Sequence, residues 1–153
     1  FTAVIVGAVV PEQLAFAGEL KRKIEAAGLQ SRIIITGELP IEDVVRWYQR
    51  LTIYAFTSRN EGFGLTLIEA MSAGAALVAA RAGAAEFVVE DGVTGVLTPP
   101  GDADALAAAL EPLMRDPAAA AAAMGARARQ RVVDKFSLDA EAGAIAGVYR
   151  TLI

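Results

Sequence analysis

Short apolar runs alternate along this chain with longer segments that have helical periodicity. The runs are apolar at most consecutive positions, as is typical of strands buried on both faces; they lie at residues 4–6, 32–37, 53–57, 76–80 and 95–97. The other segments repeat apolar residues at intervals of three and four, which predicts helices; these lie at residues 11–27, 40–50, 65–74, 86–89, 102–114, 117–135 and from 137 onward. Strands that alternate with helices predict an α/β fold of three layers, with helices on both faces of a mostly parallel sheet.

Loops that follow the strands of one parallel sheet emerge at the same edge, where ligands bind in open α/β sheets. We therefore expect residues 7–11, 37–40, 58–64 and 80–85 to share a rim. The most informative of these segments is residues 58–74, which predicts a strand end, a glycine loop and a helix. Gly62 and Gly64 suit a tight turn that approaches a ligand closely, and the start of the helix favours an anion.

Glu69 is the only charged residue between Glu61 and Arg81. Its helix is otherwise made of uncharged residues, so we expect the helix to be largely buried and Glu69 to need partners there. Two hydroxyls of a sugar would satisfy the carboxylate. A basic side chain, or a cap on another element, would satisfy it as well, and the residues alone leave this open.

Composition excludes several kinds of chemistry. The 153 residues contain no cysteine and no histidine, which removes disulfides, thiol nucleophiles, imidazole bases and the usual zinc sites. A net charge of −4 with 14 basic residues argues against a nucleic-acid partner. Alanine supplies much of the 55% hydrophobic content, and no uncharged apolar stretch reaches the length of a membrane span, so we expect no transmembrane segment.

Glu61 and Glu69 are separated by seven residues and belong to a longer ordered set of motifs. The set comprises Glu-Gly-Phe-Gly-Leu at 61–65, Glu-Ala-Met at 69–71, Gly74, Asp-Gly-Val-Thr-Gly at 91–95 and Pro-Gly-Asp at 100–102. It resembles the signature of retaining glycosyltransferases of the GT-B fold, family 4 (group 1), in particular their C-terminal, nucleotide-sugar-binding domain. The resemblance implies a Rossmann-like fold, and we expect residues 1–153 to be one such domain of a longer enzyme.

The resemblance also implies roles for individual residues. Glu69 is expected to bind the ribose hydroxyls of a nucleotide diphosphate sugar, and Glu61 to act as the catalytic residue beside the donor sugar. Donor sugar and diphosphate would be held by Glu61, Gly62, Phe63, Gly64, Leu65 and Thr66. For the Phe63 ring we favour hydrophobic anchoring of the loop over stacking on the ligand. Gly37 and Leu39 match a loop that contacts the base, although a plain strand-to-helix turn explains them nearly as well.

The implied reaction transfers a hexose with retention to a glycan or lipid-linked acceptor in bacterial lipopolysaccharide or polysaccharide biosynthesis. No cofactor and no metal are expected, since the nucleotide sugar is a substrate. The enzyme is expected in the cytoplasm, with peripheral contact at the inner face of the cytoplasmic membrane left open. Alternatives are a nucleotide-binding module without activity of its own, a GT-B-type nucleotide-sugar epimerase, which the lack of histidine disfavours, and a non-catalytic partner-binding domain.

The sequence also departs from the family pattern. The family has a first βα unit whose loop supplies an Arg and a Lys for the diphosphate, and we expect this chain to lack that unit as well as the acceptor-binding N-terminal domain. Glu86 is displaced by one position from the acid of the family's Gly-Gly-x-x-Glu motif, so no role is carried onto it. Asp91 and Gly92 are expected to serve the turn alone, and Arg127, Arg129 and Arg131 to be solvated.

Overall fold

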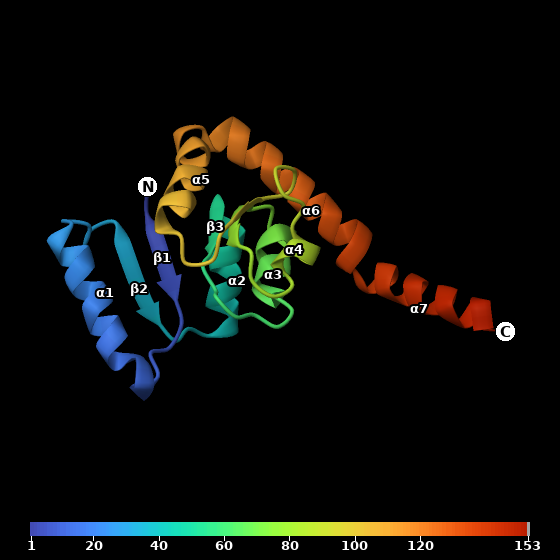
Figure 1. Cartoon of the computed structure of the whole chain (residues 1–153), viewed down its shortest axis with the longest axis horizontal. Helices are drawn as coiled ribbons and strands as arrows, with labels where there is room; N and C mark the ends of the chain where they lie inside the picture. The colour runs from blue at the N-terminus through green and yellow to red at the C-terminus, as the bar shows by residue number, and fades with distance from the viewer. Residues whose placement is uncertain (153) are drawn as a thin grey trace. The chain divides into compact units, whose positions relative to one another are not determined.

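The computed structural model describes residues 1–152 and divides the chain into two compact units, Phe1–Trp47 and Tyr48–Ile153. Figure 1 shows the order of the elements. The expectation that residues 1–153 form one domain stays a prediction.

The first unit is a parallel βαβ arrangement. Strand β1 (Ala3–Val6) is followed by the short 3₁₀ helix η1 (Pro11–Gln13), helix α1 (Leu14–Ala26) and strand β2 (Ile33–Gly37). The two strands pair in parallel, with Ala3 opposite Ile33. Helix α2 (Ile41–Arg50) comes next, and its last residues belong to the second unit. All four predicted elements are therefore present.

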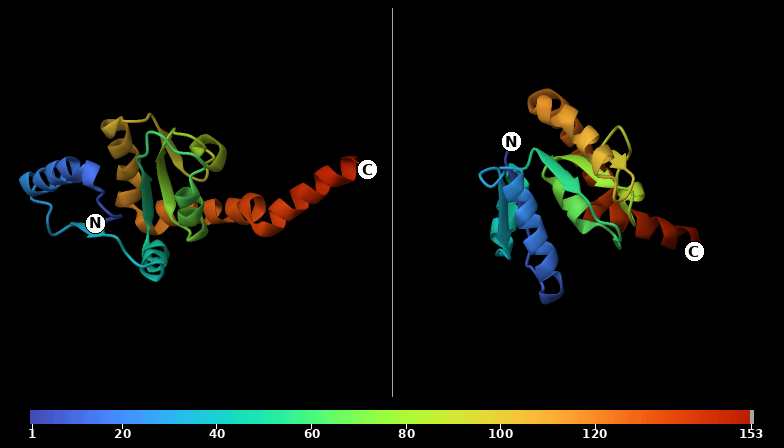
Figure 2. Two further views of the ribbon diagram at one scale, coloured as in Figure 1. Left: turned by 90° about the horizontal axis from the view of Figure 1, so that it is seen from below. Right: turned by 60° about the vertical axis from the view of Figure 1, so that its left-hand side comes forward.

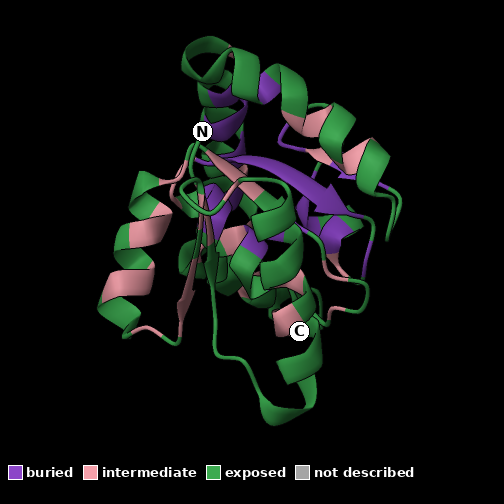
Figure 3. Ribbon diagram, turned by 90° about the vertical axis from the view of Figure 1, so that its left-hand side faces the viewer, coloured by how far each residue is buried: buried purple, intermediate pink, exposed green. Residues whose placement is uncertain are grey.

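The second unit contains a three-stranded parallel sheet of order β3–β4–β5. Strands β3 (Ile53–Phe56), β4 (Ala76–Ala80) and β5 (Val96–Thr98) alternate with helices α3 (Leu65–Ser72) and α4 (Ala85–Val88). Every residue of the central strand β4 is buried, as its uninterrupted apolar run predicts. In Figure 3, where buried residues are purple, the buried central strand lies beside helices whose outer faces are exposed.

Among residues 1–152 every strand pairing is parallel, as the sequence predicts, with β1–β2 in the first unit and the order β3–β4–β5 in the second. The apolar runs correctly predicted the strands, and their alternation with helices predicted the parallel direction. Neither pattern specifies which strand edges meet, because pairing depends on residues far apart in the chain. The rim that all four loops were expected to share therefore remains a prediction.

The core of the second unit has two sides because successive side chains of β4 point to opposite faces. Leu77 and Ala79 belong to one cluster, together with Leu67 and Met71 of α3. Ala76 and Val78 belong to the other, which receives Leu113 and partly buried residues of α5. This alternation places helices on both faces of the sheet, which confirms the three-layer α/β expectation for this unit.

Three further helices complete the unit, and each begins as the sequence predicts. Helix α5 (Ala103–Arg115), the π-helical turn η2 (Pro117–Ala121), helix α6 (Ala122–Phe136) and helix α7 (Leu138–Leu152) follow in order. Side-chain oxygens of Asp102, Asp116 and Ser137 accept hydrogen bonds from the backbone N–H three residues onward. Helix α7 contacts α6 and extends away from the sheet of this unit (Figure 2).

The cap of α5 gives a first testable expectation. Replacing Asp102 by alanine removes the acceptor that lies 2.9 Å from the backbone N of Ala105, so the free energy of unfolding should fall by about 1 kcal/mol. Asp104→Ala is the matched control, because it removes the same charge from the same helical turn without removing the cap. Urea unfolding measures both variants, and equal losses would contradict the capping role.

Candidate functional site

The loop after β3 is held by hydrogen bonds between its own residues and leads directly into helix α3. The Ser58 hydroxyl donates to the carbonyl of Asn60 at 2.9 Å, and the Glu61 carboxylate accepts from the N–H of Gly62 at 3.1 Å. Gly64, the residue before α3, has a left-handed backbone with φ of 76°, which glycine adopts without strain. The first N–H groups of a helix lack partners within the helix, so the loop and these groups can face an anion together.

Gly83 brings the loop after β4 against the loop after β3. A Cβ atom built on Gly83 would lie 1.9 Å from the carbonyl oxygen of Glu61, and the φ of Gly83 is +55°. Both the close approach and the backbone conformation therefore require glycine. This contact fixes the backbone of Glu61, and it joins two of the loops that the sequence analysis assigned to the carboxyl edge of the sheet.

Glu69 lies on the exposed side of α3, which corrects the expectation of a buried carboxylate. Leu67, Ala70 and Met71 face the core, whereas Leu65 and Glu69 are exposed. The buried side chains occupy only one face of the helix, so the uncharged composition did not imply burial all round. An exposed Glu69 is accessible to a ligand without first losing its water to the protein interior.

Tyr48 of α2 lies near Glu69, and its ring pairs with that of Tyr54 on β3, with centroids 6.0 Å apart. The pKa of Tyr48 is raised above the ordinary value, first by burial, next by the neighbouring Tyr54 and then by Glu69. No short-range sequence signal points to the proximity of Tyr48 to Glu69, because 21 positions separate the two residues.

The Phe63 ring is 50% exposed, so it does not anchor the loop in the core as we favoured. Thr66 is also exposed, at the first turn of α3, where its hydroxyl is accessible. Gly62, Gly64 and Leu65 lie on the same short segment. The structure thus brings the predicted residues 61–66 together, and their contact with a donor stays a prediction.

Gly37 and Leu39 belong to the first unit. Gly37 has a φ of 72°, and its carbonyl accepts from the N–H of Gly7 at 3.0 Å. The Thr36 hydroxyl donates to the same carbonyl at 2.9 Å. These contacts fit the strand-to-helix turn that we weighed, and contact with a base stays a prediction.

Arg81 links the end of β4 to the turn before β5. Its guanidinium contacts Glu86 at 3.1 Å and Asp91 at 2.5 Å, and the other oxygen of Asp91 accepts from the N–H of Leu97 at 2.8 Å. Hydrogen bonding to Glu86, followed by the charge of Asp91, raises the pKa of Arg81. Asp91 therefore does more than shape its turn, since it also joins the turn to two strands.

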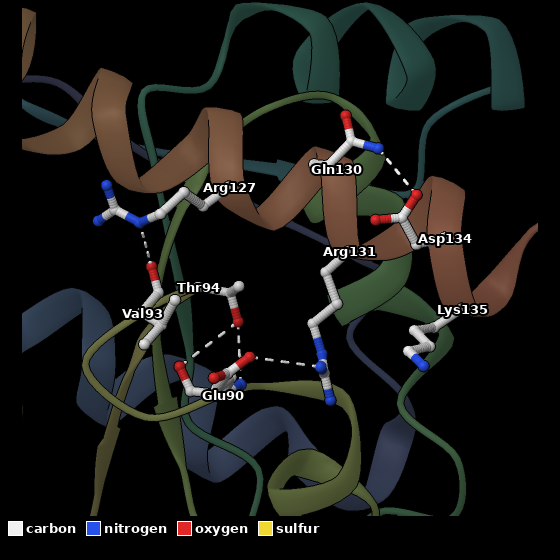
Figure 4. A pocket seen from close by; sticks show the side chains of 8 residues that line it. All are labelled: Glu90, Val93, Thr94, Arg127, Gln130, Arg131, Asp134 and Lys135. Atoms are coloured by element: carbon white, nitrogen blue, oxygen red, sulfur yellow. Dashed lines mark hydrogen bonds and ion pairs between the residues drawn. The ribbon is translucent and has the colours of Figure 1, made fainter.

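A hollow of about 260 Å³ lies between α6 and the turn before β5 (Figure 4). Its lining comprises Glu90, Val93, Thr94, Arg127, Gln130, Arg131, Asp134 and Lys135, none of them a predicted site residue. Arg127 donates to the carbonyl of Val93 at 2.8 Å, and Arg131 donates to those of Val88 and Phe87 at 2.8 and 3.0 Å. These two arginines are thus not simply solvated, because Arg127 ties α6 to the turn before β5 and Arg131 ties it to α4.

Within residues 1–152, no group of acidic side chains is arranged to hold a metal ion. No described helix combines the length and the apolar character that a membrane crossing needs.

Comparison with known proteins identifies the family. The family model described as glycosyl transferases group 1 matches residues 1–131. This chain belongs to that family. The match confirms the resemblance carried by the motifs at residues 61–102.

Two relatives match over essentially the whole chain. The lipopolysaccharide core biosynthesis mannosyltransferase LpcC of Rhizobium leguminosarum bv. viciae is 46% identical over 100% of this chain and 43% of its own length. The corresponding mannosyltransferase LpsB of Rhizobium meliloti is 37% identical over 99% of this chain and 43% of its own length. The chain therefore spans less than half of each relative.

Two solved structures confirm the fold class. Anabaena Alr3699/HepE in complex with UDP superposes with a TM-score of 0.86 at 30% identity, covering 98% of this chain and 41% of that one. The C-terminal domain of LpcC, a group 1 protein from Francisella tularensis, gives 0.84 at 32% identity, covering 90% and 70%. The residues thus have the fold of a GT-B C-terminal domain.

Proposed function

We propose that the complete protein is a retaining glycosyltransferase that moves a hexose from a nucleotide diphosphate sugar to a glycan or lipid-linked acceptor. In this proposal the segment described above holds the donor. The observation that carries it is the loop of residues 58–64, which is fixed by Gly83 and opens α3 just beyond the carboxyl end of β3. Such a loop presents a carboxylate, backbone N–H groups and the positive end of a helix to one ligand.

Each predicted residue has a distinct role in this proposal. The exposed Glu69 carboxylate accepts hydrogen bonds from the ribose hydroxyls, while Glu61 contacts the donor sugar. The N–H groups of residues 62–65, with the Thr66 hydroxyl, bind the sugar and the diphosphate. As the bond from the anomeric carbon to the phosphate oxygen breaks, negative charge grows on the diphosphate. Fixed N–H donors stabilise that charge more in the transition state than in the bound substrate.

The relatives suggest the sugar and the biological process. LpcC and LpsB are both named as mannosyltransferases of lipopolysaccharide core biosynthesis. We therefore assign this protein to the same process in the bacterial cytoplasm and infer mannose as the sugar. The acceptor binds to the part of the enzyme outside these residues. Because Alr3699/HepE was solved with UDP, uridine nucleotides belong in any test of the donor.

Glu69→Ala in the complete protein tests the donor site. Loss of the ribose acceptor should weaken nucleoside diphosphate binding by about 10- to 100-fold, because hydrogen bonds to a charged group contribute about 1.5–3 kcal/mol. Titration calorimetry with UDP, GDP and ADP measures the affinity of both proteins. Glu42→Ala removes an exposed acid from α2 and serves as the control. Unchanged affinity in Glu69→Ala would contradict the ribose assignment.

A further inference from the structure

The side chain of Arg59 reaches between two loops at the carboxyl edge of the second unit's sheet. Arg59 lies in the loop after β3, and Gly101 lies in the loop after β5. A Cβ atom built on Gly101 would lie 3.6 Å from Nη2 and 3.7 Å from Nε of Arg59, which is ordinary van der Waals contact. Because β3 and β5 flank β4 in a parallel sheet, the side chain connects the loops of the two outer strands.

The backbone that carries Arg59 is held in place. The hydrogen bond from the Ser58 hydroxyl to the carbonyl of Asn60, at 2.9 Å, spans this residue. Glu61, two positions onward, is fixed by the close approach of Gly83. The Arg59 guanidinium therefore extends from a constrained loop and rests against Gly101, which reduces the conformational entropy that it loses on binding a ligand.

No group of the protein neutralises the Arg59 guanidinium. In the part of the chain that the structure describes, it forms no ion pair and no hydrogen bond. The neighbouring acids have other partners: Asp102 accepts from the N–H of Ala105, and Glu61 accepts from the N–H of Gly62. Since Arg59 is exposed, its N–H donors are open to an anion from solution.

Arg59 lies apart from the N–H groups that we propose for the diphosphate. Those groups begin α3, which packs on the face of β4 that carries Leu77 and Ala79. Helix α5 follows Gly101 and packs on the opposite face, which carries Val78. The guanidinium beside Gly101 is thus displaced away from the start of α3. A diphosphate bound at α3 leaves this cation for a second anionic group.

The acceptor has to approach the same loop. In the proposed function its hydroxyl meets the anomeric carbon of the donor sugar, which Glu61 contacts, and Arg59 precedes Glu61 by two positions. Although the main binding surface of the acceptor lies outside these residues, its reacting end must come within reach of Arg59. The guanidinium fork matches the geometry of a phosphate or a carboxylate, to which it can donate two parallel hydrogen bonds.

We propose that Arg59 binds a phosphate or carboxylate group of the acceptor and so makes the enzyme select acidic acceptors. The inference rests on the proposed function, since it requires the donor sugar to lie at Glu61. Arg59 has no part in binding the nucleotide, and its role is in acceptor specificity.

Arg59→Gln in the complete protein tests this role, because it removes the charge and keeps a polar side chain. The probes are glucose 6-phosphate and glucuronate, as acidic sugars, and glucose, as a neutral one. Their binding is measured by ligand-observed NMR with UDP or GDP present at saturation, which keeps the acidic probes out of the diphosphate position. The unmodified protein should bind the acidic sugars about 10-fold more tightly than glucose, as expected for one charge-assisted hydrogen bond. Arg59→Gln should abolish this preference.

Arg129→Gln is the matched control, since it removes the same charge from an exposed position on α6 and should keep the preference. Arg59→Lys keeps the charge without the fork and should give an intermediate preference. The preference is a ratio within each protein, so it does not depend on the fraction that is folded. An unmodified protein that does not favour the acidic sugars, or an unchanged preference in Arg59→Gln, would overturn the inference.

Calorimetry with UDP, GDP and uridine separates this inference from the proposed function. Arg59→Gln should leave the affinity for all three within about twofold. If it weakens the binding of UDP or GDP and not that of uridine, Arg59 binds the diphosphate, so the inference is wrong and the donor site stands. If Glu69→Ala leaves the nucleotide affinity unchanged, the ribose assignment fails, whatever Arg59→Gln does to the binding of acidic sugars.

Discussion

Gly83→Ala is expected to lower the free energy of unfolding by about 2–4 kcal/mol and to weaken nucleotide binding. The new methyl group would lie 1.9 Å from the carbonyl oxygen of Glu61, and the backbone would keep a φ of +55°. Overpacking costs about 1–3 kcal/mol, and a left-handed backbone costs about 1–2 kcal/mol for alanine. To relieve the clash, the Glu61 loop has to move, which displaces the groups that we propose bind the donor.

Urea unfolding and calorimetry with UDP and GDP measure the two effects of Gly83→Ala. Gly92→Ala is the matched control, because Gly92 has a φ of +75° and nothing within 4 Å of a built Cβ. It should show only the cost of the backbone conformation, about 1–2 kcal/mol, with nucleotide affinity unchanged. Equal losses of stability in the two variants would show that the contact with Glu61 does not constrain the loop.

Gly125→Ala is expected to destabilise the protein by about 2–4 kcal/mol, although alanine is the better helix former. Gly125 is buried in α6, and a Cβ there would lie 1.9 Å from the carbonyl oxygen of Gly74 and 2.8 Å from its carbonyl carbon. Both atoms are backbone, so no flexible side chain can turn away. Relief requires α6 to move off the segment between α3 and β4, which disturbs well-packed neighbours.

Gly143→Ala is the control for that substitution. Gly143 lies in α7, and nothing lies within 4 Å of a Cβ built there. The same exchange should leave stability unchanged or raise it by up to about 1 kcal/mol, because glycine is the weaker helix former. Thermal unfolding compares the variants. A stabilised Gly125→Ala protein would mean that α6 does not approach Gly74 as closely as the structure shows.

The two pairs of variants test different parts of one architecture. Gly125 allows α6 to pack close to the strand that carries the core of the second unit. Gly83 allows the loop after that strand to meet Glu61. Since both contacts join residues far apart in the chain, they link the packing of the helices to the geometry of the Glu61 loop.

The sequence alone predicted the elements and the family, because both depend on local order. Apolar runs gave the strands. Helical periodicity gave helices that begin near residues 102, 117 and 137, where Asp102, Asp116 and Ser137 cap α5, η2 and α7. The ordered motifs from Glu61 to Asp102 gave the group 1 family, because their residue types and spacings can be read directly along the chain.

Composition did not predict which residues of α3, the helix that carries Glu69, are exposed. Its lack of other charges suggested burial, whereas Leu65, Glu69 and Ser72 form an exposed stripe. These positions are spaced by four and three residues, so helical periodicity contained a signal for that stripe. The packing of β3, β4 and α6 decides which face of α3 meets the core. The short helix has too few polar positions for its sequence to show which face this is.

Strand pairing, the contact between Gly83 and Glu61 and the proximity of Tyr48 to Glu69 were decided only by the tertiary structure. Each joins residues at least 18 positions apart, and such contacts form only when whole elements pack. Hydrophobic periodicity indicates which face of each element is buried, but not which neighbouring element covers that face. The sequence therefore specified the elements and the family of this protein, and packing specified that Glu69 is exposed and that Glu61 lies against Gly83.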